Sequence, residues 1–565
     1  MKPAHGIRLP LILVLVSAAL AMPAVISGWM NDDHFFDTTL YETDAPFGYY
    51  KFMDRFDEAQ LQPWWVSPDY ELRFLRPLAS LTLHLDFTLF CDSPLGAHIH
   101  SLLWSLVLLL GGFAVLSRVL PRRESSWAMV IFTFAICHAW GAGWIAARHA
   151  VLGGALTMWS AAFYLRWRAG EGKRLGAISL ALFAVGLAAG EMALALAAFV
   201  FCYEVAGANG TWRERLLSLA PFAGVALAYV IAYKALGYGA SGSGAYLDPM
   251  SQPGDYLAGL FPKTAAMLGS FGFGVPAMMR VVPGAESITT SAGMLVLLLL
   301  VAGLLLARKR LDADLRRSWL WLILAVYLPL LPGLAGLAQG REFVLSAVAF
   351  AGASSILLRS LLAERGAWYR RILPFGVAGL LMLGLFVVSP LSRLGQSFFI
   401  YKTAELAVQA GDGSKVDCPD GAPVYLINGD FMRSVLFPFV VARHQGITFP
   451  SWQQLVTPES DITVKRTATD KIVIASKDKP LVNDFLDLYR PAGDRLAVDD
   501  VIEIESLRAA IIDATKAGPT KIEFTIPGLA TPDGACMLRY DDEMLHDWTP
   551  PALGESEIIE YVPPM

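Results

Sequence analysis

The stretch LPLILVLVSAALAMPAVISGW at residues 9–29, followed by MNDDHFF at 30–36, decides how this chain begins to fold. An uncharged run of this length can cross a bilayer as one helix. Directly behind it stand two adjacent carboxylates, Asp32 and Asp33. Charged side chains beside a hydrocarbon layer cost free energy, so this pair marks a candidate functional site. A solvated helix end is the plainer alternative.

The whole chain has the composition of a polytopic membrane protein. Of its 565 residues, 55% are hydrophobic and 17% are charged, and the mean hydropathy is +0.48, which excludes an ordinary soluble protein. Stretches near spanning length predict an all-α membrane domain over residues 1–390 with about eleven transmembrane helices, at 9–29, 98–120, 127–144, 151–167, 175–190, 192–206, 216–236, 291–307, 318–337, 343–361 and 372–390. The two short stretches beside Gly190-Glu191 can also form one broken span.

Basic residues fall in alternate loops, which predicts the side of the membrane on which each loop lies. Arginines and lysines gather before the first span and after the second, fourth, sixth, eighth and tenth. The amino terminus is therefore predicted to be cytoplasmic, and an odd number of spans places the loop 29–97 and the segment after Pro390 outside. That loop has 12 acidic and 4 basic residues, and the segment from 391 has 26 and 16. This balance excludes a basic nucleic-acid surface.

The start of the chain has a second interpretation. A basic beginning, an apolar run and Ala19-Leu20-Ala21 also fit a cleavable signal peptide. The apolar run continues to Trp29, which favours a retained anchor. Both interpretations export the aspartate pair.

The predicted outer loop contains two features suited to a membrane interface. One is the Trp64-Trp65 pair, because tryptophan gathers at the level of the lipid headgroups. The other is the apolar segment 77–90, which begins with a proline and is too short to span. It predicts a helix lying in the interface, with a packed loop helix as the alternative.

From residue 391 the composition changes to that of a soluble domain, which we predict to be mixed α/β and extracytoplasmic. Residues 422–428 resemble a buried strand, 431–443 a helix, 462–475 a hairpin, and 521–526 another strand. Cys418 and Cys536 form the one plausible disulfide of the five cysteines. The domain shows no nucleophile–base set, so acceptor binding and support of the membrane part are its open roles.

Five landmarks stand in the order found in one family of membrane enzymes. They are Asn31-Asp32-Asp33-His34 after the first span; Arg76-Pro77-Leu78 with Leu89 to Pro94 and His98 before the second; Trp144 to Arg148 before the fourth; Gly190-Glu191-Met192 after the fifth; and Arg341-Glu342-Phe343 before the tenth. In this order they resemble the polytopic glycosyltransferases of the GT-C class, in particular the TMTC-type O-mannosyltransferase branch and its bacterial relatives. The resemblance is closest over residues 1–210, thinner to 390, and ends there.

Two departures from the family's pattern concern the substrates. The family usually has Ser-Lys-Glu where this chain has Ala189-Gly190-Glu191, so a basic residue is missing beside the acid. No 34-residue helical repeat follows the membrane part. The donor sugar and the acceptor are therefore not given by the resemblance.

The resemblance implies that a sugar moves, with inversion, from a polyprenyl-phosphate donor to an acceptor on the extracytoplasmic face of a bacterial inner membrane. An interfacial carboxylate can take the proton of the acceptor, and Asp33 and Asp32 are the predicted catalytic bases. The guanidinium fork suits a phosphate. Arg341, Arg148 and Arg76 are the predicted donor-phosphate ligands, because they stand at outer ends where the positive-inside rule does not place them.

Each of these roles has a plainer alternative. An outer arginine can snorkel at the interface, and Glu191, predicted to be an acceptor-binding or structural acid, can belong to an ion pair. No cofactor is predicted and no metal-ligand set is recognisable, although a divalent ion held by Asp32, Asp33 and a lipid phosphate stays open.

Two other functions fit the same composition. A transporter or flippase for lipid-linked sugars should carry ionisable residues near the midplane of its helices, whereas the predicted spans are almost free of them. A non-catalytic assembly subunit would have no need of an aspartate pair with three outer arginines.

Overall fold

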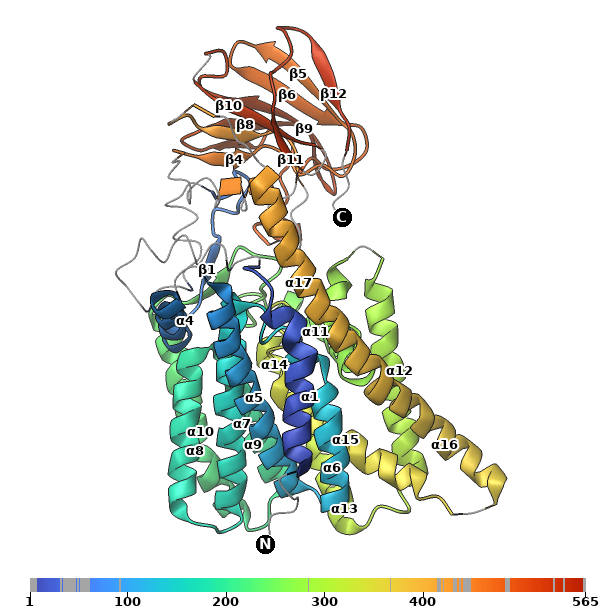
Figure 1. The fold of residues 1–565 in the computed structure, drawn as a ribbon. Coiled ribbons are helices and arrows are strands. Elements are labelled where there is room, and N and C mark those ends of the chain that lie inside the picture. Colours follow the sequence, from blue (N-terminus) through green and yellow to red (C-terminus); the bar gives the residue numbers. More distant parts are fainter. Residues whose placement is uncertain are drawn as a thin grey trace.

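The computed structural model describes residues 8–30, 33, 47, 50, 61–90, 93–282, 284–365, 367–413, 418–419, 421–429, 434–435, 438–439, 449–482, 488–531, 534–541 and 544–561. A helical bundle forms one part of the molecule and a strand-rich domain the other (Figure 1). The long helix α17 (Ser389–Gly413) runs obliquely along the bundle and ends at the strand-rich domain. We call the end of the bundle that faces this domain the domain end.

Among the described residues, fourteen further α-helices and several short helical turns build the bundle. The helices are α1 (Arg8–Val25), α4 (Pro77–Phe90), α5 (Pro94–Val119), α6 (Arg122–Phe134), α7 (Arg148–Arg168), α8 (Lys173–Ala189), α9 (Ala195–Cys202), α10 (Trp212–Ala235), α11 (Pro253–Phe273), α12 (Glu286–Ala307), α13 (Ala313–Tyr327), α14 (Leu330–Gly333), α15 (Val344–Leu362) and α16 (Trp368–Leu383). The turns are η1 (Ile136–His138), η2 (Ile145–Ala147), η3 (Glu191–Leu194), η4 (Tyr203–Gly207), η5 (Ala277–Val281) and η6 (Gly384–Val388).

Six helical stretches of the described chain are long and apolar enough to cross a membrane, so the chain is an integral membrane protein. They are Arg8–Val25, Pro94–Val119, Trp212–Ala235, Glu286–Ala307, Val344–Leu362 and Trp368–Leu406. The predicted number of eleven is therefore not confirmed. Helix α6 ends at Phe134, inside the predicted span 127–144, and α13 ends at Tyr327, inside the predicted span 318–337 and just before Pro329.

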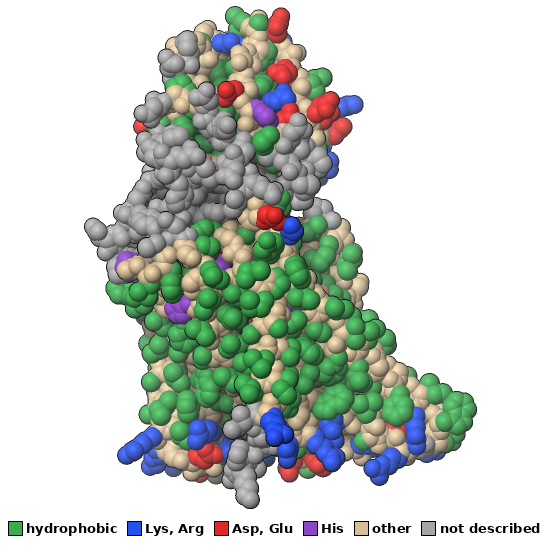
Figure 2. Space-filling model, in the orientation of Figure 1, with side chains coloured by type: hydrophobic (Ala, Val, Ile, Leu, Met, Phe, Trp, Pro, Cys, Tyr) green, Lys and Arg blue, Asp and Glu red, His purple; other side chains and the backbone are tan. Residues whose placement is uncertain are grey.

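Basic side chains gather at the end of the bundle opposite the strand-rich domain, which we call the basic end (Figure 2). They come from the loops and helix ends at this end of the bundle, and exposed members are Arg122, Arg123, Lys173, Arg174, Arg213, Arg308 and Lys309. Between this belt and the domain end, the bundle presents a broad hydrophobic surface in Figure 2. This is the distribution expected where a bilayer surrounds the bundle.

Close helix packing holds the interior of the bundle. A Cβ at Gly293 of α12 would overlap the carbonyl oxygen of Ala265 in α11, so glycine lets these two helices touch. Arg393 of α17 is 2% exposed, donates to the carbonyl oxygen of Thr133, and donates through Nη2 to Ser17 Oγ at 2.8 Å. One buried arginine thus ties α17 to α6 and α1.

Helix α4 occupies the range predicted for an interfacial helix and lies at the domain end, across the direction of α8 and α10 (Figure 1). Its outer face is apolar, with Leu85 45% and Leu89 69% exposed. Just before it, strand β1 (Glu71–Arg73) pairs antiparallel with β2 (Gly239–Ser241), which follows α10. This two-stranded ribbon fixes the chain that leads into α4.

The C-terminal domain contains two sheets. The smaller has the order β11 (Met544–Asp547), β10 (Cys536–Asp541), β3 (Val424–Leu426) and β4 (Trp452–Gln454), with β3 parallel to both of its neighbours. The larger has the order β12 (Ser556–Ile559), β5 (Ile462–Ala468), β6 (Lys471–Ser476), β9 (Gly518–Thr525), β8 (Arg508–Thr515) and β7 (Val501–Glu503), and all of its pairs are antiparallel. The predicted hairpin and both predicted strands are present.

The described part of this domain is built from strands, with one short turn, η9 (Ala492–Asp494). The predicted helix 431–443 lies largely outside the described residues. Side chains from the two sheets share one apolar core, which includes Ile427, Ile474 and Phe524. Alternate residues of β5 are buried because one face of the sheet covers this core.

Trp64 and Trp65 lie in this same core, only 1% and 3% exposed. The prediction that they sit at a membrane interface is wrong. They fill the C-terminal domain instead, and the loop they belong to bridges the two parts of the molecule.

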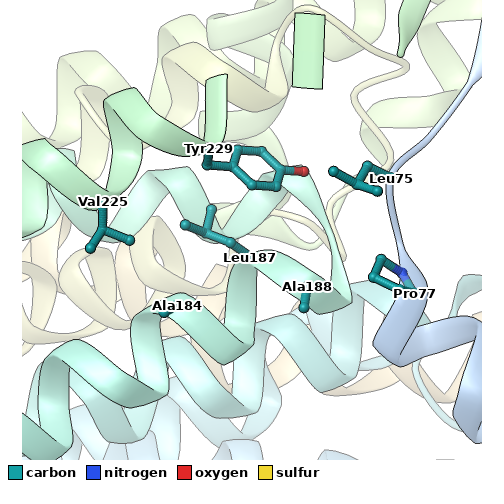
Figure 3. A pocket seen from close by; sticks show the side chains of 7 residues that line it. All are labelled: Leu75, Pro77, Ala184, Leu187, Ala188, Val225 and Tyr229. Atoms are coloured by element: carbon teal, nitrogen blue, oxygen red, sulfur yellow. The ribbon is translucent and has the colours of Figure 1, made fainter. Parts of the chain in front are cut away.

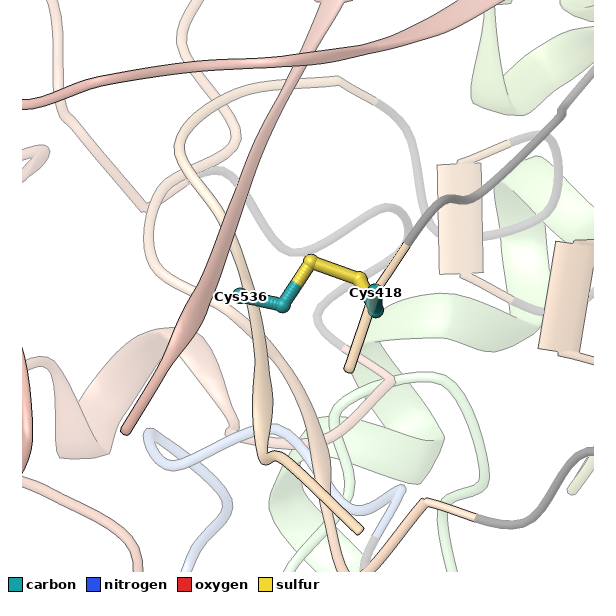
Figure 4. Close-up of a disulfide and its surroundings, with 2 residues drawn as sticks. All are labelled: Cys418 and Cys536. Atoms are coloured by element: carbon teal, nitrogen blue, oxygen red, sulfur yellow. A yellow bond between two sulfur atoms is a disulfide. The ribbon is translucent and has the colours of Figure 1, made fainter. Parts of the chain in front are cut away.

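A disulfide joins Cys418 to Cys536 in the C-terminal domain, with a Cα–Cα distance of 5.5 Å (Figure 4). The predicted pairing is confirmed. Cys137 and Cys202 are buried and unpaired by disulfides.

Candidate functional site

The predicted site residues that the structure describes lie close together at the domain end of the bundle. Asp33 follows α1, Arg76 precedes α4, Arg148 opens α7, Glu191 opens η3, and Arg341 precedes α15. Asp32 lies outside the described residues. These five residues make different contacts, which are described in turn below.

Asp33 is 1% exposed, and its carboxylate accepts three backbone N–H groups. The donors are Met30 at 3.1 Å, Ile145 at 3.3 Å and Ala146 at 2.6 Å. Asp33 therefore holds the turn η2 against the end of the first helix. Donors aimed at a carboxylate stabilise its charged form and weaken it as a base.

Tyr50 connects this turn to the next part of the site. Its hydroxyl donates to the carbonyl oxygen of Ala146 at 2.8 Å, and its own carbonyl oxygen accepts from the N–H of Phe74 at 3.1 Å. The ring lies beneath the guanidinium of Arg76, whose Cζ is 5.0 Å from the ring centre and 4.1 Å from that of Phe74. Two aromatic rings thus orient Arg76.

Arg76 forms a two-pronged ion pair with Glu191. Its Nε donates to Oε2 at 3.0 Å and its Nη2 donates to Oε1. Burial opposes the charge of Arg76, but the carboxylate beside it outweighs that effect and raises the pKa of Arg76 above its ordinary value. Two predicted residues, one for the donor phosphate and one for the acceptor, are therefore paired with each other.

Arg148 is fully buried and every nitrogen of its guanidinium is used. Nε donates to Ser101 Oγ at 3.0 Å, Nη1 to the carbonyl oxygen of Thr82 at 3.2 Å, and Nη2 to that of Ala97 at 2.8 Å. Nη1 also pairs with the carboxylate of Asp86. This network binds α4, α5 and α7 together.

Asp86 extends the network to the edge of the bundle. Its other oxygen lies 2.6 Å from Nδ1 of His100, and Nε2 of His100 accepts from Nε1 of Trp104 at 2.9 Å. His100 therefore carries its proton on Nδ1, because Nε2 is used as an acceptor. Sequence reasoning missed Asp86, although an aspartate inside an apolar segment was a signal for a buried pair.

Arg341 contrasts with the other two arginines. Its side chain is 8% exposed, yet among the described residues neither Nε nor Nη1 has a hydrogen-bond partner. Glu342 Oε1 lies 3.3 Å from Nε, an ion-pair distance without hydrogen-bond geometry. The guanidinium lies over the ring of Trp144 at 4.2 Å. Buried donors without acceptors are rare in native proteins, and of the three predicted arginines Arg341 is the one whose hydrogen bonds are incomplete among the described residues.

Glu342 is a buried carboxyl that sequence reasoning did not assign. Burial raises the pKa of Glu342 above its ordinary value, and the positive charges of Arg341 and Arg76 act against that rise. Tyr50, beneath Arg76, is hydrogen-bonded to Ala146, and Arg341 lies over Trp144 two residues earlier, so the two arginines lie on either side of one short segment. The position of Glu342 beside Arg341 was the signal in the sequence.

An apolar hollow of about 230 Å³ adjoins the Arg76–Glu191 pair (Figure 3). It lies between α8, α10 and the start of α4, and is lined by Leu75, Pro77, Ala184, Leu187, Ala188, Val225 and Tyr229. Figure 3 shows the hydroxyl of Tyr229 pointing toward Leu75, and this hydroxyl has no partner among the described residues. Leu75 and Pro77 flank Arg76 in sequence, and Ala188 stands three residues before Glu191, so the hollow is lined by neighbours of both members of the ion pair.

The described residues include no group of three His, Cys, Asp or Glu side chains that can hold a metal ion. Asp32 and His34, which belong to the predicted aspartate landmark, lie outside those residues.

No family model and no curated protein matches the chain. Among solved structures it is similar to the oligosaccharyltransferase of Archaeoglobus fulgidus in the apo form, with a TM-score of 0.46 and 11% identity over 81% of this chain and 65% of that chain. AglB of the same organism in complex with an inhibitory peptide and a dolichol-phosphate gives 0.42 and 12%, over 78% and 64%. ArnT from Cupriavidus metallidurans bound to undecaprenyl phosphate gives 0.32 and 15%, over 78% and 85%.

These matches are glycosyltransferases of the GT-C type, the class that the sequence landmarks resemble, and they do not single out the TMTC branch. The chain spans 65% of the length of the archaeal enzyme. All three TM-scores lie below 0.5. The function proposed below therefore depends on the residues of this chain.

Proposed function

We propose that this protein is a membrane glycosyltransferase that moves a sugar from a polyprenyl-phosphate donor to an acceptor on the extracytoplasmic face of a bacterial inner membrane. The observation that carries the proposal is Arg341, a buried guanidinium of which two nitrogens have no hydrogen-bond partner among the described residues. A second arginine, Arg76, lies near the same segment 144–146 and adjoins an apolar hollow. An anionic head joined to an apolar chain fits this combination.

The orientation follows from charge and redox chemistry. The basic end belongs in the cytoplasm by the positive-inside rule, and the site lies at the opposite end, beside the C-terminal domain (Figures 1 and 2). The Cys418–Cys536 disulfide supports the same assignment, because such bonds persist in the periplasm and not in a bacterial cytosol.

The phosphate of the donor contacts Arg341 first in this proposal. Arg76 joins when the phosphate replaces the carboxylate of Glu191, and the first part of the lipid chain occupies the hollow lined by Leu187 and Val225. Arg148 takes a structural role, because all of its nitrogens already have acceptors. Glu191, once released, faces the acceptor.

The transfer itself needs one base. The oxygen of the acceptor hydroxyl forms a bond to the anomeric carbon as the bond from that carbon to the phosphate oxygen breaks. The hydroxyl proton goes to a carboxylate, and the arginines hold the charge of the departing polyprenyl phosphate. Attack opposite to the leaving group inverts the anomeric centre. A positioned base contributes roughly 10²–10⁴-fold.

Asp32 and Asp33 are the candidates for this base. The three N–H donors on Asp33 support a positioning role for it, so Asp32 is the base that we test first. Asp32→Asn should abolish turnover and leave donor binding and stability unchanged. Asp33→Asn should lower the thermal unfolding midpoint as well, since it weakens the hold on η2.

The experiment uses the full-length protein in nanodiscs with a panel of radiolabelled polyprenyl-phosphate sugars. Transferred and released sugar are measured for wild type, Asp32→Asn, Asp33→Asn and Arg341→Gln. Arg371→Gln, which changes an exposed arginine in the first turn of α16, is the matched control and should retain wild-type turnover. If no donor is turned over and Arg341→Gln does not weaken donor binding, the proposal fails.

A further inference from the structure

Five buried polar atoms around Arg341 lack hydrogen-bond partners among the described residues. They are Nε and Nη1 of Arg341, Nε1 of Trp144, Oε1 of Gln339 and Oε2 of Glu342. More than nine in ten buried polar atoms in native proteins are hydrogen-bonded, and each one left without a partner is unfavourable. Several such atoms in one place indicate that a ligand completes the site.

The atoms belong to one short loop and the turn that faces it. Gln339, Arg341 and Glu342 stand within the five residues before α15. Gly340, between the first two, has a φ of +96°, a left-handed conformation that favours glycine. Trp144 precedes η2, and Arg341 lies over its ring at 4.2 Å. The side chain of Arg341 is 8% exposed and that of Glu342 is 15% exposed.

The chemistry of the five atoms restricts the ligand. Three are donors, two on Arg341 and one on Trp144, and two are acceptors, on Gln339 and Glu342. A bare phosphate supplies only acceptors at neutral pH, so it would leave Gln339 and Glu342 unsatisfied. The ligand must bring oxygen acceptors and O–H donors within one molecule. A sugar hydroxyl is both, and a sugar joined to a phosphate also supplies the anion.

Charge restricts the ligand further. Arg341 and Glu342 have opposite charges and lie 3.3 Å apart, so together they present no net charge to the sugar. A charged group on the sugar would therefore meet no counter-charge that is not already paired. A neutral sugar fits this balance.

We propose that Gln339, Glu342 and Trp144 form the donor-sugar site, and that it selects a neutral sugar with two free hydroxyl groups that donate to Gln339 Oε1 and Glu342 Oε2. This inference rests on the function proposed above and names its substrate class. Arg341 holds the phosphate of the same molecule, so these three residues determine specificity and Arg341 determines affinity for the lipid phosphate.

The test separates sugar recognition from phosphate recognition. The full-length protein in nanodiscs is titrated with polyprenyl phosphate and with polyprenyl-phosphate hexose, and the ratio of the two dissociation constants is the sugar preference. Wild type should prefer the hexose form by at least about tenfold. Gln339→Leu should lose most of that preference while binding polyprenyl phosphate as wild type does. Glu342→Gln should lose most of it while binding polyprenyl phosphate at least as tightly as wild type, because Arg341 loses the carboxylate 3.3 Å from its Nε. Arg341→Gln should weaken both ligands.

The controls make each outcome informative. Glu405→Gln, a half-exposed acid on α17, should keep the wild-type preference, and a polyprenyl-phosphate amino sugar should bind no better than the sugar-free lipid. If wild type binds the lipid phosphate and shows no preference for the hexose, the sugar site is overturned and the proposed function stands. If Gln339→Leu and Glu342→Gln keep the preference, the site lies elsewhere. If wild type binds neither lipid, the proposed function itself fails.

Discussion

Trp64 donates a hydrogen bond from its indole Nε1 to the carbonyl oxygen of Leu455 at 3.0 Å, although 391 residues separate them in the chain. Its ring also meets Phe524 edge to face, with 5.4 Å between the ring centres. Arg490 adds hydrogen bonds to the carbonyl oxygens of Trp65 at 2.8 Å and Val66 at 3.2 Å. The first loop is therefore anchored in the C-terminal domain shortly before it reaches Arg76.

Replacing this anchor should loosen both parts of the molecule. We expect Trp64→Ala to destabilise the C-terminal domain by about 3–5 kcal/mol, the usual cost of removing a buried tryptophan, and to lower turnover because the chain before Arg76 is no longer held. Faster limited proteolysis at residues 60–70 would show the loosened chain, and a lower thermal unfolding midpoint would show the loss of stability. Trp368→Ala, which removes a tryptophan that is 75% exposed, should change neither. Equal protease resistance of the Trp64 variant and wild type would contradict this account.

The disulfide should stabilise the same domain. It closes a loop of 118 residues, and chain-entropy models give about 4–5 kcal/mol for loops of this size. Cys418→Ser and Cys536→Ser should each lower the unfolding midpoint, and the double variant should be no less stable than either single one. Mass spectrometry of alkylated protein from membranes should find Cys137 and Cys202 modified only after unfolding. Labelling of Cys418 without a reductant would refute the bond.

The sequence alone predicted the parts of this molecule that depend on local pattern. Hydrophobic periodicity predicts the hairpin at β5 and β6, and a proline at the first helical position predicts where α4 begins. Both signals lie within the segment itself and need no distant contact. The number of eleven spans is not confirmed. Hydropathy does not show where α6 ends, at Phe134, before the chain enters η1 and the glycine-containing turn that precedes η2.

Tertiary contacts decided what the sequence left open. A tryptophan suits a domain core as well as a membrane interface, so its residue type does not predict which of these Trp64 occupies. Its hydrogen bond to the distant residue Leu455 shows that it lies in the domain core. The three outer arginines look alike in sequence, yet Arg148 meets Asp86, Arg76 meets Glu191 and Arg341 has no hydrogen-bonded acceptor among the described residues. Which arginine is available depends on contacts across the bundle.

The buried pair of Arg148 and Asp86 should matter for folding more than for catalysis. Asp86→Asn leaves a buried guanidinium without its counter-charge, which typically costs about 3–5 kcal/mol. Replacing both partners with apolar residues, as Asp86→Leu with Arg148→Met, should recover part of that loss. The unfolding midpoint of the single and double variants measures this. Loss of donor binding in a double variant of normal stability would instead assign Arg148 to the phosphate.

Glu191 should restrain Arg76 in the absence of substrate. In Glu191→Gln the guanidinium loses its charged partner, so a phosphate no longer has to displace a carboxylate. We expect polyprenyl phosphate to bind about tenfold more tightly, equivalent to about 1.4 kcal/mol, with turnover reduced because the acceptor loses its carboxylate. Arg76→Gln should weaken the same binding. Weaker lipid binding in the Glu191 variant would show that the pair is only structural.

We expect the Glu342 carboxylate to lower the free energy of unfolding at neutral pH. Burial raises the pKa of its carboxyl above the ordinary 4.5 in the folded protein, so the folded state holds this proton more tightly than the unfolded state. The stability that this proton provides is complete below pH 4.5 and is lost as the pH rises through the folded-state pKa. Each unit of pKa difference corresponds to about 1.4 kcal/mol.

Glu342→Gln removes this titration and should therefore be at least as stable as wild type at pH 7. The gap between the two unfolding midpoints should narrow as the pH falls toward 4.5. Scans in nanodiscs from pH 4.5 to 8 check this, with Glu405→Gln as the exposed control. A Glu342→Gln variant that is less stable than wild type across the whole range would mean that the carboxylate is paired in the folded protein. The unpartnered Oε2 would then not be available to a sugar hydroxyl.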